Sequence, residues 1–99
     1  MYALITHLRF KTDEGPNMEA AEARKQSADT AAQHGFRAFA LVRIGPSEAV
    51  FVRIYDTRED LAAGFSKGFA PHLGAEFAAS PERVEGEVMV SSWVEHPTA

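Results

Sequence analysis

The amino-acid sequence predicts a single α+β domain in which two helical regions cover one face of a four-stranded antiparallel sheet. Its 99 residues are enough for one hydrophobic core but not for two. An apolar fraction of 45% is ordinary for a globular protein, so the chain is not expected to be disordered as a whole. The segments follow one another as strand, helix, strand, strand, helix and strand, and this order indicates the predicted sheet.

Four segments have the composition of β-strands. They are residues 2–10, 36–44, 49–55 and 82–94, which are rich in β-branched, aliphatic and aromatic side chains. The turn sequence GPSE separates the second strand from the third. A loop of two or four residues there pairs Arg43 with Val50 and Leu41 with Val52, which places Val42 and Val52 on opposite faces of the sheet.

Two segments are predicted to be helical. Residues 17–35 are rich in alanine, with Asn17 at the N-cap and Gly35 in a left-handed turn at the end. Residues 57–80 begin with a capping-box pattern formed by Thr57 and Asp60. Pro71 interrupts this second region, so residues 71–79 are expected to form a short helix of their own.

The predicted order, β-α-β-β-α-β, is that of a ferredoxin-like split βαβ fold. Its helices cover one face of the sheet, whereas the strands carry apolar side chains on both faces. Apolar surface left in water forgoes about 25 cal/mol of stabilisation per Å², so the uncovered face needs a partner. We therefore expect a homodimer in which two copies pack sheet against sheet and form an α/β barrel.

Composition and motifs exclude several classes of function. The chain has no cysteine, which excludes disulfides, thiolate metal sites and cysteine nucleophiles. A net charge of −4 without clustered lysines and arginines gives no footprint for nucleic acid. No apolar run approaches the roughly 20 residues that span a bilayer, and no signal peptide is recognisable, so a cytoplasmic protein without a membrane partner is expected. The histidines lack the spacing of a metal site, so no metal is expected.

The chain resembles the antibiotic-biosynthesis-monooxygenase-like domains of the dimeric α/β-barrel superfamily. The resemblance rests on the aromatic-bearing strand FVRIYD, the charged helix start TREDL and the broken-helix step APHL, which lie between residues 51 and 73. In element order and length it extends over nearly all of residues 1–99, as one domain. It implies a ligand pocket between the sheet and the helices of each subunit.

The same resemblance implies a cofactor-independent monooxygenase or related oxidoreductase that acts on a small aromatic or quinol-like substrate. An imidazole titrates near neutral pH and can deprotonate a phenol, and an arginine can bind the resulting anion. The haem-degrading branch of this superfamily has an asparagine on the first strand, and a tryptophan and a histidine on the second helix. This chain departs from that pattern, because His7 stands at the matching position of the first strand and the second helix has no tryptophan. The candidate catalytic residues are His72 and His7, and the candidate substrate-binding residues are Phe65, Phe69, Arg53 and Tyr55.

These residues also have structural interpretations. His72 can cap the helix break, and His7 can lie at a dimer seam or in solvent. Arg53 can pair with a strand carboxylate such as Glu85 or Glu87. The two phenylalanines of the helix can belong to the core. The alternative to an enzyme is therefore a non-catalytic dimer that binds a small ligand or is purely structural.

Overall fold

The computed structural model describes residues 1–68 and 77–91, together with the side chains of these residues except those of residues 65–68. Seven elements follow one another in the chain. They are β1 (Tyr2–Arg9), α1 (Gly15–Lys25), α2 (Ser27–Ala31), β2 (Phe36–Gly45), β3 (Glu48–Tyr55), α3 (Arg58–Gly68) and β4 (Glu82–Glu87).

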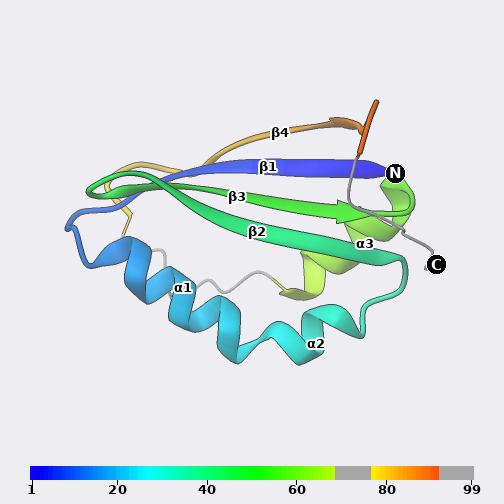
Figure 1. The fold of residues 1–99 in the computed structure, drawn as a ribbon, viewed down its shortest axis with the longest axis horizontal. Helices are drawn as coiled ribbons and strands as arrows, with labels where there is room; N and C mark the ends of the chain where they lie inside the picture. Colours follow the sequence, from blue (N-terminus) through cyan, green and yellow to red (C-terminus); the bar gives the residue numbers. More distant parts are fainter. Residues whose placement is uncertain (69–76, 92–99) are drawn as a thin grey trace.

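The four strands form one antiparallel sheet in the order β2-β3-β1-β4. The helices lie together on one side of this sheet, and the other side is open (Figure 1). β1 and β2 run parallel to each other, as do β3 and β4, and a helical connection joins the strands of each pair. Such crossovers are right-handed, which places both helical connections on the same face of the sheet. The predicted α+β split βαβ fold is confirmed.

The register between β2 and β3 differs by one residue from the predicted one. Leu41 lies opposite Phe51, and Val42 lies opposite Val50. The loop has two residues, as one of the two predicted lengths required, but the register shifts between Arg43 and Gly45. A bulge inserts one extra residue into one strand, and a slip by one residue exchanges the faces. The prediction that placed Val42 on the face opposite to Val52 was therefore wrong.

Several element ends also differ from the predictions. The predicted helix over residues 17–35 is divided at Gln26, and its N-cap is Glu14 rather than Asn17. Gly35 has a φ of 74°, which confirms the left-handed turn. The last strand ends at Glu87, short of the predicted residue 94. Residues 77–79 are not helical, and Phe77 forms an antiparallel bridge with Phe10 instead.

The core lies between the sheet and the helices, in two clusters. One is formed by Leu8, Phe10, Ala49 and Phe51 and the other by Leu4, Tyr55 and Leu61. The open face keeps apolar side chains in solvent, because 41% of Ile5, 48% of Val42 and 64% of Val84 is exposed. None of the helices in the described ranges has the length and hydrophobicity to cross a membrane.

Candidate functional site

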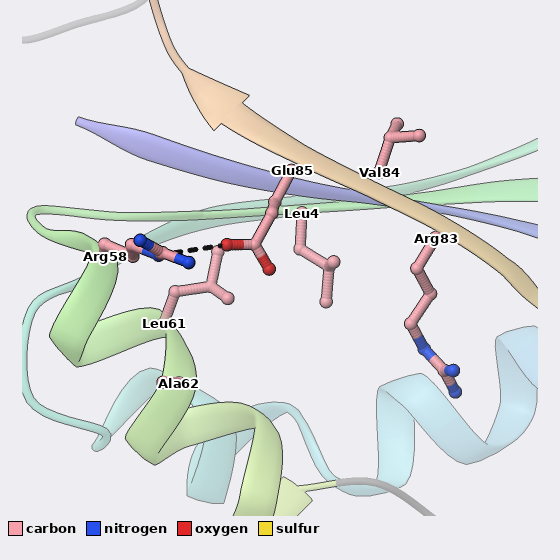
Figure 2. Close-up of a pocket in the computed structure, with 7 residues that line it drawn as sticks. All are labelled: Leu4, Arg58, Leu61, Ala62, Arg83, Val84 and Glu85. Atoms are coloured by element: carbon pink, nitrogen blue, oxygen red, sulfur yellow. Dashed lines mark ion pairs between the residues drawn. The ribbon is translucent and has the colours of Figure 1, made fainter.

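A pocket of about 280 Å³ lies between α3 and the inner side of β1 and β4. It exists because α3 packs mainly against the central strands, where Leu61 joins Leu4 and Tyr55 in the core, so the edge strand β4 extends beyond the helix. The lining residues come from three elements (Figure 2). They are Leu4 of β1, Arg58, Leu61 and Ala62 of α3, and Arg83, Val84 and Glu85 of β4.

The charged side chains of the pocket follow from the register of β4. Arg83 lies opposite Thr6, and Glu85 lies opposite Leu4, so both share the inner face with these buried residues. Val84 points to the open face instead (Figure 2). Charged residues that point inward are tolerated on an edge strand, because its inner face meets less of the apolar core. The pocket therefore has an apolar floor with ionised groups along one wall.

An ion pair joins the two sides of the pocket. Nε of Arg58, at the start of α3, lies 3.3 Å from Oε1 of Glu85. Thr57 fixes this start of the helix, because its hydroxyl accepts a hydrogen bond of 3.1 Å from the backbone N–H of Asp60. The side chain of Arg58 is 70% exposed and that of Glu85 is 40% exposed, so the pair lies at the mouth of the pocket.

Arg53 is on the helix side of the sheet, next to the pocket but not among its lining residues. Its guanidinium carbon lies 4.9 Å from the ring centroid of Phe51. Its Nη1 is buried and has no hydrogen-bond partner in the described part of the chain. Glu85, one of the two carboxylates expected to pair with Arg53, is paired with Arg58.

Tyr55 is fully buried in the core rather than exposed to the pocket. Its hydroxyl donates a hydrogen bond to Gln33, whose amide donates one of 3.4 Å to the carbonyl of Gly64. Burial raises the pKa of Tyr55 above its ordinary value, and the positive charge of Arg53 acts in the opposite direction. Tyr55 therefore connects β3 to α3 in this structure.

His7 lies on the open face of the sheet, away from the pocket. It is paired with Val50, and Nε2 of its ring lies 2.7 Å from Oε2 of Glu48. Arg9 and Glu82 complete a charged group at this end of the sheet, with 3.0 Å between Nη1 of Arg9 and Oε1 of Glu82. As a candidate catalytic residue His7 was expected to face the cavity, and its alternative place was a dimer seam or solvent. The structure places it on the open face of the sheet, and it does not line the pocket.

The remaining predicted site residues lie at the limit of the described chain. Phe65 belongs to α3, but its side chain is outside the described residues. Phe69, Pro71 and His72 are outside the described residues altogether. Their predicted roles therefore stay predictions.

Sequence reasoning missed the charged residues of the pocket. The sequence indicates Arg58 only as part of a charged helix start and gives no role to Arg83. The inner positions of β4 carry Arg83 and Glu85, whereas those of β1 carry Leu4 and Leu8. Two charged residues at alternate positions of a strand are a signal of an uncovered edge, but the register was needed to show that they face the helices.

No group of three or more histidine or acidic side chains suited to a metal ion is found within residues 1–68 and 77–91. Among the described residues that line the pocket, the charged groups are the guanidinium groups of Arg58 and Arg83 and the carboxylate of Glu85. Such groups can bind and orient an ionised organic ligand.

Comparisons with known proteins agree with this fold. A protein of Nitrosomonas europaea classed with the antibiotic biosynthesis monooxygenases superposes with a TM-score of 0.75, at 20% identity, over 91% of this chain and 100% of that one. A cofactor-independent oxygenase of Streptomyces nogalater superposes with a TM-score of 0.72, at 16% identity, over 92% and 95%. A monooxygenase of Streptomyces coelicolor in complex with nanaomycin D superposes with a TM-score of 0.73, at 11% identity, over 91% and 92%.

These structural similarities define the fold of the chain. The chain has the fold of the antibiotic-biosynthesis-monooxygenase-like domains, and the resemblance predicted from its sequence is confirmed at this level. No family model matches the sequence, and no curated protein matches it. At 11–20% identity the shared fold does not by itself define the reaction or the substrate.

Proposed function

We propose that the protein is a cofactor-independent monooxygenase that acts on a small aromatic or quinol-like substrate bound between the sheet and α3. The observation that carries this proposal is the pocket of about 280 Å³, with an apolar floor and guanidinium groups on its wall. The fold of the chain is shared with a cofactor-independent oxygenase and with a monooxygenase in complex with nanaomycin D.

The chemistry needs little from the protein. An ionised phenol or quinol can transfer electrons to O₂ directly, so that one oxygen atom enters the substrate and the other leaves as water with two substrate hydrogens. The protein has to exclude water and stabilise the anion. Arg58 and Arg83 supply positive charge beside the pocket, and Leu4 and Leu61 supply its apolar surface. Arg53, one strand further along the inner face, is a second candidate for the anion.

In this proposal His72 is the base that takes the phenolic proton, and Phe65 and Phe69 form further walls. All three follow Leu61 along the same helical region in the sequence, and Leu61 lines the pocket. Residues at spacings of three or four share a helix face, which supports these assignments for the part of the region that is helical. Tyr55 contributes by holding α3 in place.

Oxygen consumption by the purified protein with a panel of hydroquinones and naphthols tests the proposal. The variant Ala62→Leu places a larger side chain in the pocket and is expected to lower the rate at least tenfold, whereas Ala63→Leu, on the next position of the same helix, is its control. His72→Ala is expected to lower the rate as well. No oxygen uptake with any compound would reject the oxygenase and favour the non-catalytic alternative.

We also propose that a second copy of the chain covers the open face of the sheet. Support comes from the exposure of Ile5, Val42, Ile44 and Val84, which is unusual for a soluble monomer when such side chains adjoin. Their strands carry further aliphatic residues on the same face. An obligate interface of this kind commonly buries more than about 2,000 Å². His7 and Glu48 would then lie at one end of the interface.

Light scattering at micromolar concentration tests the dimer. Because Val42 and Val52 lie on the same face, Val42→Glu and Val52→Glu are both expected to dissociate it and to lower the melting temperature. Ala28→Glu, at an exposed position of α2, is the control that adds the same charge elsewhere. A folded, monodisperse monomer of the unmodified chain would contradict this proposal.

A further inference from the structure

We propose that the pocket selects aromatic carboxylates of one or two rings, and that Arg58 binds the ligand carboxylate in exchange for Glu85. This inference deepens the proposed function, because it names the charge class and the size of the compound at the same site. It concerns binding, however, and therefore holds or fails whether or not the bound compound is oxidised.

The first argument is the charge of the lining. Three charged side chains line the pocket, and two of them, Arg58 and Arg83, carry guanidinium groups, whereas the third, Glu85, carries a carboxylate. The chain as a whole has a net charge of −4, so the lining is richer in positively charged groups than the molecule as a whole. A guanidinium binds a carboxylate through two parallel hydrogen bonds, which favours a ligand carboxylate over a neutral group.

The second argument is that Arg58 already holds a carboxylate at the mouth. Oε1 of Glu85 lies 3.3 Å from Nε of Arg58, and the pair joins α3 to β4 across the opening (Figure 2). Both side chains are substantially exposed, and ion pairs in such positions contribute little to stability. A ligand that carries its carboxylate on an apolar ring also buries this ring against the apolar floor of the pocket. The exchange is therefore favourable for such a ligand.

The third argument is size. An apolar cavity of about 150 Å³ is known to bind benzene, and the pocket here has a volume of about 280 Å³. One ring or two fused rings therefore fit above Leu4, Leu61 and Ala62. Larger compounds are expected to bind less tightly, because part of their apolar surface would protrude from the pocket into solvent.

Calorimetric titration of the full chain at pH 7 tests the inference, with 2-naphthoate and its neutral isostere 2-naphthamide as probes. The unmodified protein is expected to bind naphthoate about tenfold more tightly than naphthamide, which corresponds to one charge-assisted contact. Sodium chloride at 0.5 M is expected to reduce this preference, because exposed charges are then screened. This arm needs no variant, so it does not depend on whether a substitution affects folding.

Two substitutions assign the preference to the ion pair. Arg58→Gln is expected to weaken naphthoate binding about tenfold and to leave naphthamide unchanged. Glu85→Gln is expected to strengthen naphthoate binding several-fold, because the competing carboxylate is removed. Arg43→Gln and Glu87→Gln are the controls with the same changes of charge, at residues that do not line the pocket.

Equal affinity for the two probes, no binding of either, or an unchanged preference in Arg58→Gln would each overturn the inference. Its failure is distinguishable from failure of the proposed oxygenase. Naphthoate binding without oxygen uptake from any hydroquinone keeps the inference and rejects the enzyme. Oxygen uptake from neutral hydroquinones without any preference for naphthoate keeps the enzyme and rejects the inference.

Discussion

Gly64 of α3 is the position at which a single added methyl group should reveal how closely the helix approaches the sheet. A Cβ at Gly64 would lie 2.6 Å from Oε1 of Gln33 and 2.7 Å from Cζ of Tyr55, in addition to its contact with the tyrosine hydroxyl. Contacts this short do not occur between folded side chains, so Gly64→Ala has to move one of the partners. Tyr55 is fully buried and cannot move freely.

Two effects of opposite sign act on the stability of this variant. Alanine is favoured over glycine in a helix by about 1 kcal/mol. Overpacking a core usually costs about 1–3 kcal/mol, and a buried hydroxyl that loses its partner adds about 1–3 kcal/mol. The end of the Gln33 side chain is flexible and can absorb part of the clash. A net destabilisation of about 1–3 kcal/mol is therefore expected.

Thermal unfolding at a fixed protein concentration measures this loss. Each kcal/mol corresponds to a shift of roughly 4–8 °C in the melting temperature of a domain of this size. In the background Tyr55→Phe the hydroxyl is absent, so Gly64→Ala is expected to be less harmful there, and the double-mutant cycle gives the coupling. A rise in melting temperature in Gly64→Ala, or no coupling to Tyr55→Phe, would refute the proposed contact between α3 and the sheet.

Three further predictions concern the loop between α2 and β2 and the start of α3. Gly35→Ala is expected to destabilise the fold by about 1–2 kcal/mol, because the φ of Gly35 is positive and the added Cβ would collide with Asp60. Gly45→Ala should be tolerated, because the atom nearest to its added Cβ is 3.7 Å away. Similar melting temperatures for the two variants would contradict this prediction. The hydrogen bond to Asp60 raises the pKa of His34 above its ordinary value of 6.5, so the stability that this contact adds is complete below pH 6.5 and is lost as the pH rises through the raised pKa. The same contact lowers the pKa of Asp60 below 3.8, so the contribution is also lost as the pH falls through that lowered pKa. The difference in melting temperature between the unmodified chain and His34→Gln should therefore be largest between these limits, and a constant difference from pH 4.5 to 8.5 would disprove the link. Thr57→Ala removes the N-cap of α3 and should cost about 1 kcal/mol in urea unfolding, whereas Thr57→Ser should restore most of it.

The sequence by itself determined part of the local structure and the order of the segments, and through them the fold class. Thr57 caps the helix that follows it, and Gly35 adopts the left-handed conformation that other residues avoid. Such features depend on neighbours in the chain, so they can be predicted without coordinates. The order of the segments then leaves few topologies, and the structure shows the predicted one.

Only the tertiary structure decided how the faces of the sheet are composed. One bulge between Arg43 and Gly45 brought Val42 and Val52 onto the same face, and nothing in the turn sequence predicted it. The pairing of β1 with β4 directed Arg83 and Glu85 toward the helices. Side chains alternate with a period of two, so the identity of a pocket wall depends on register, and register depends on contacts between residues far apart in the chain. For the same reason the family resemblance implied a pocket between sheet and helices, but the sequence did not show which charged residues line it.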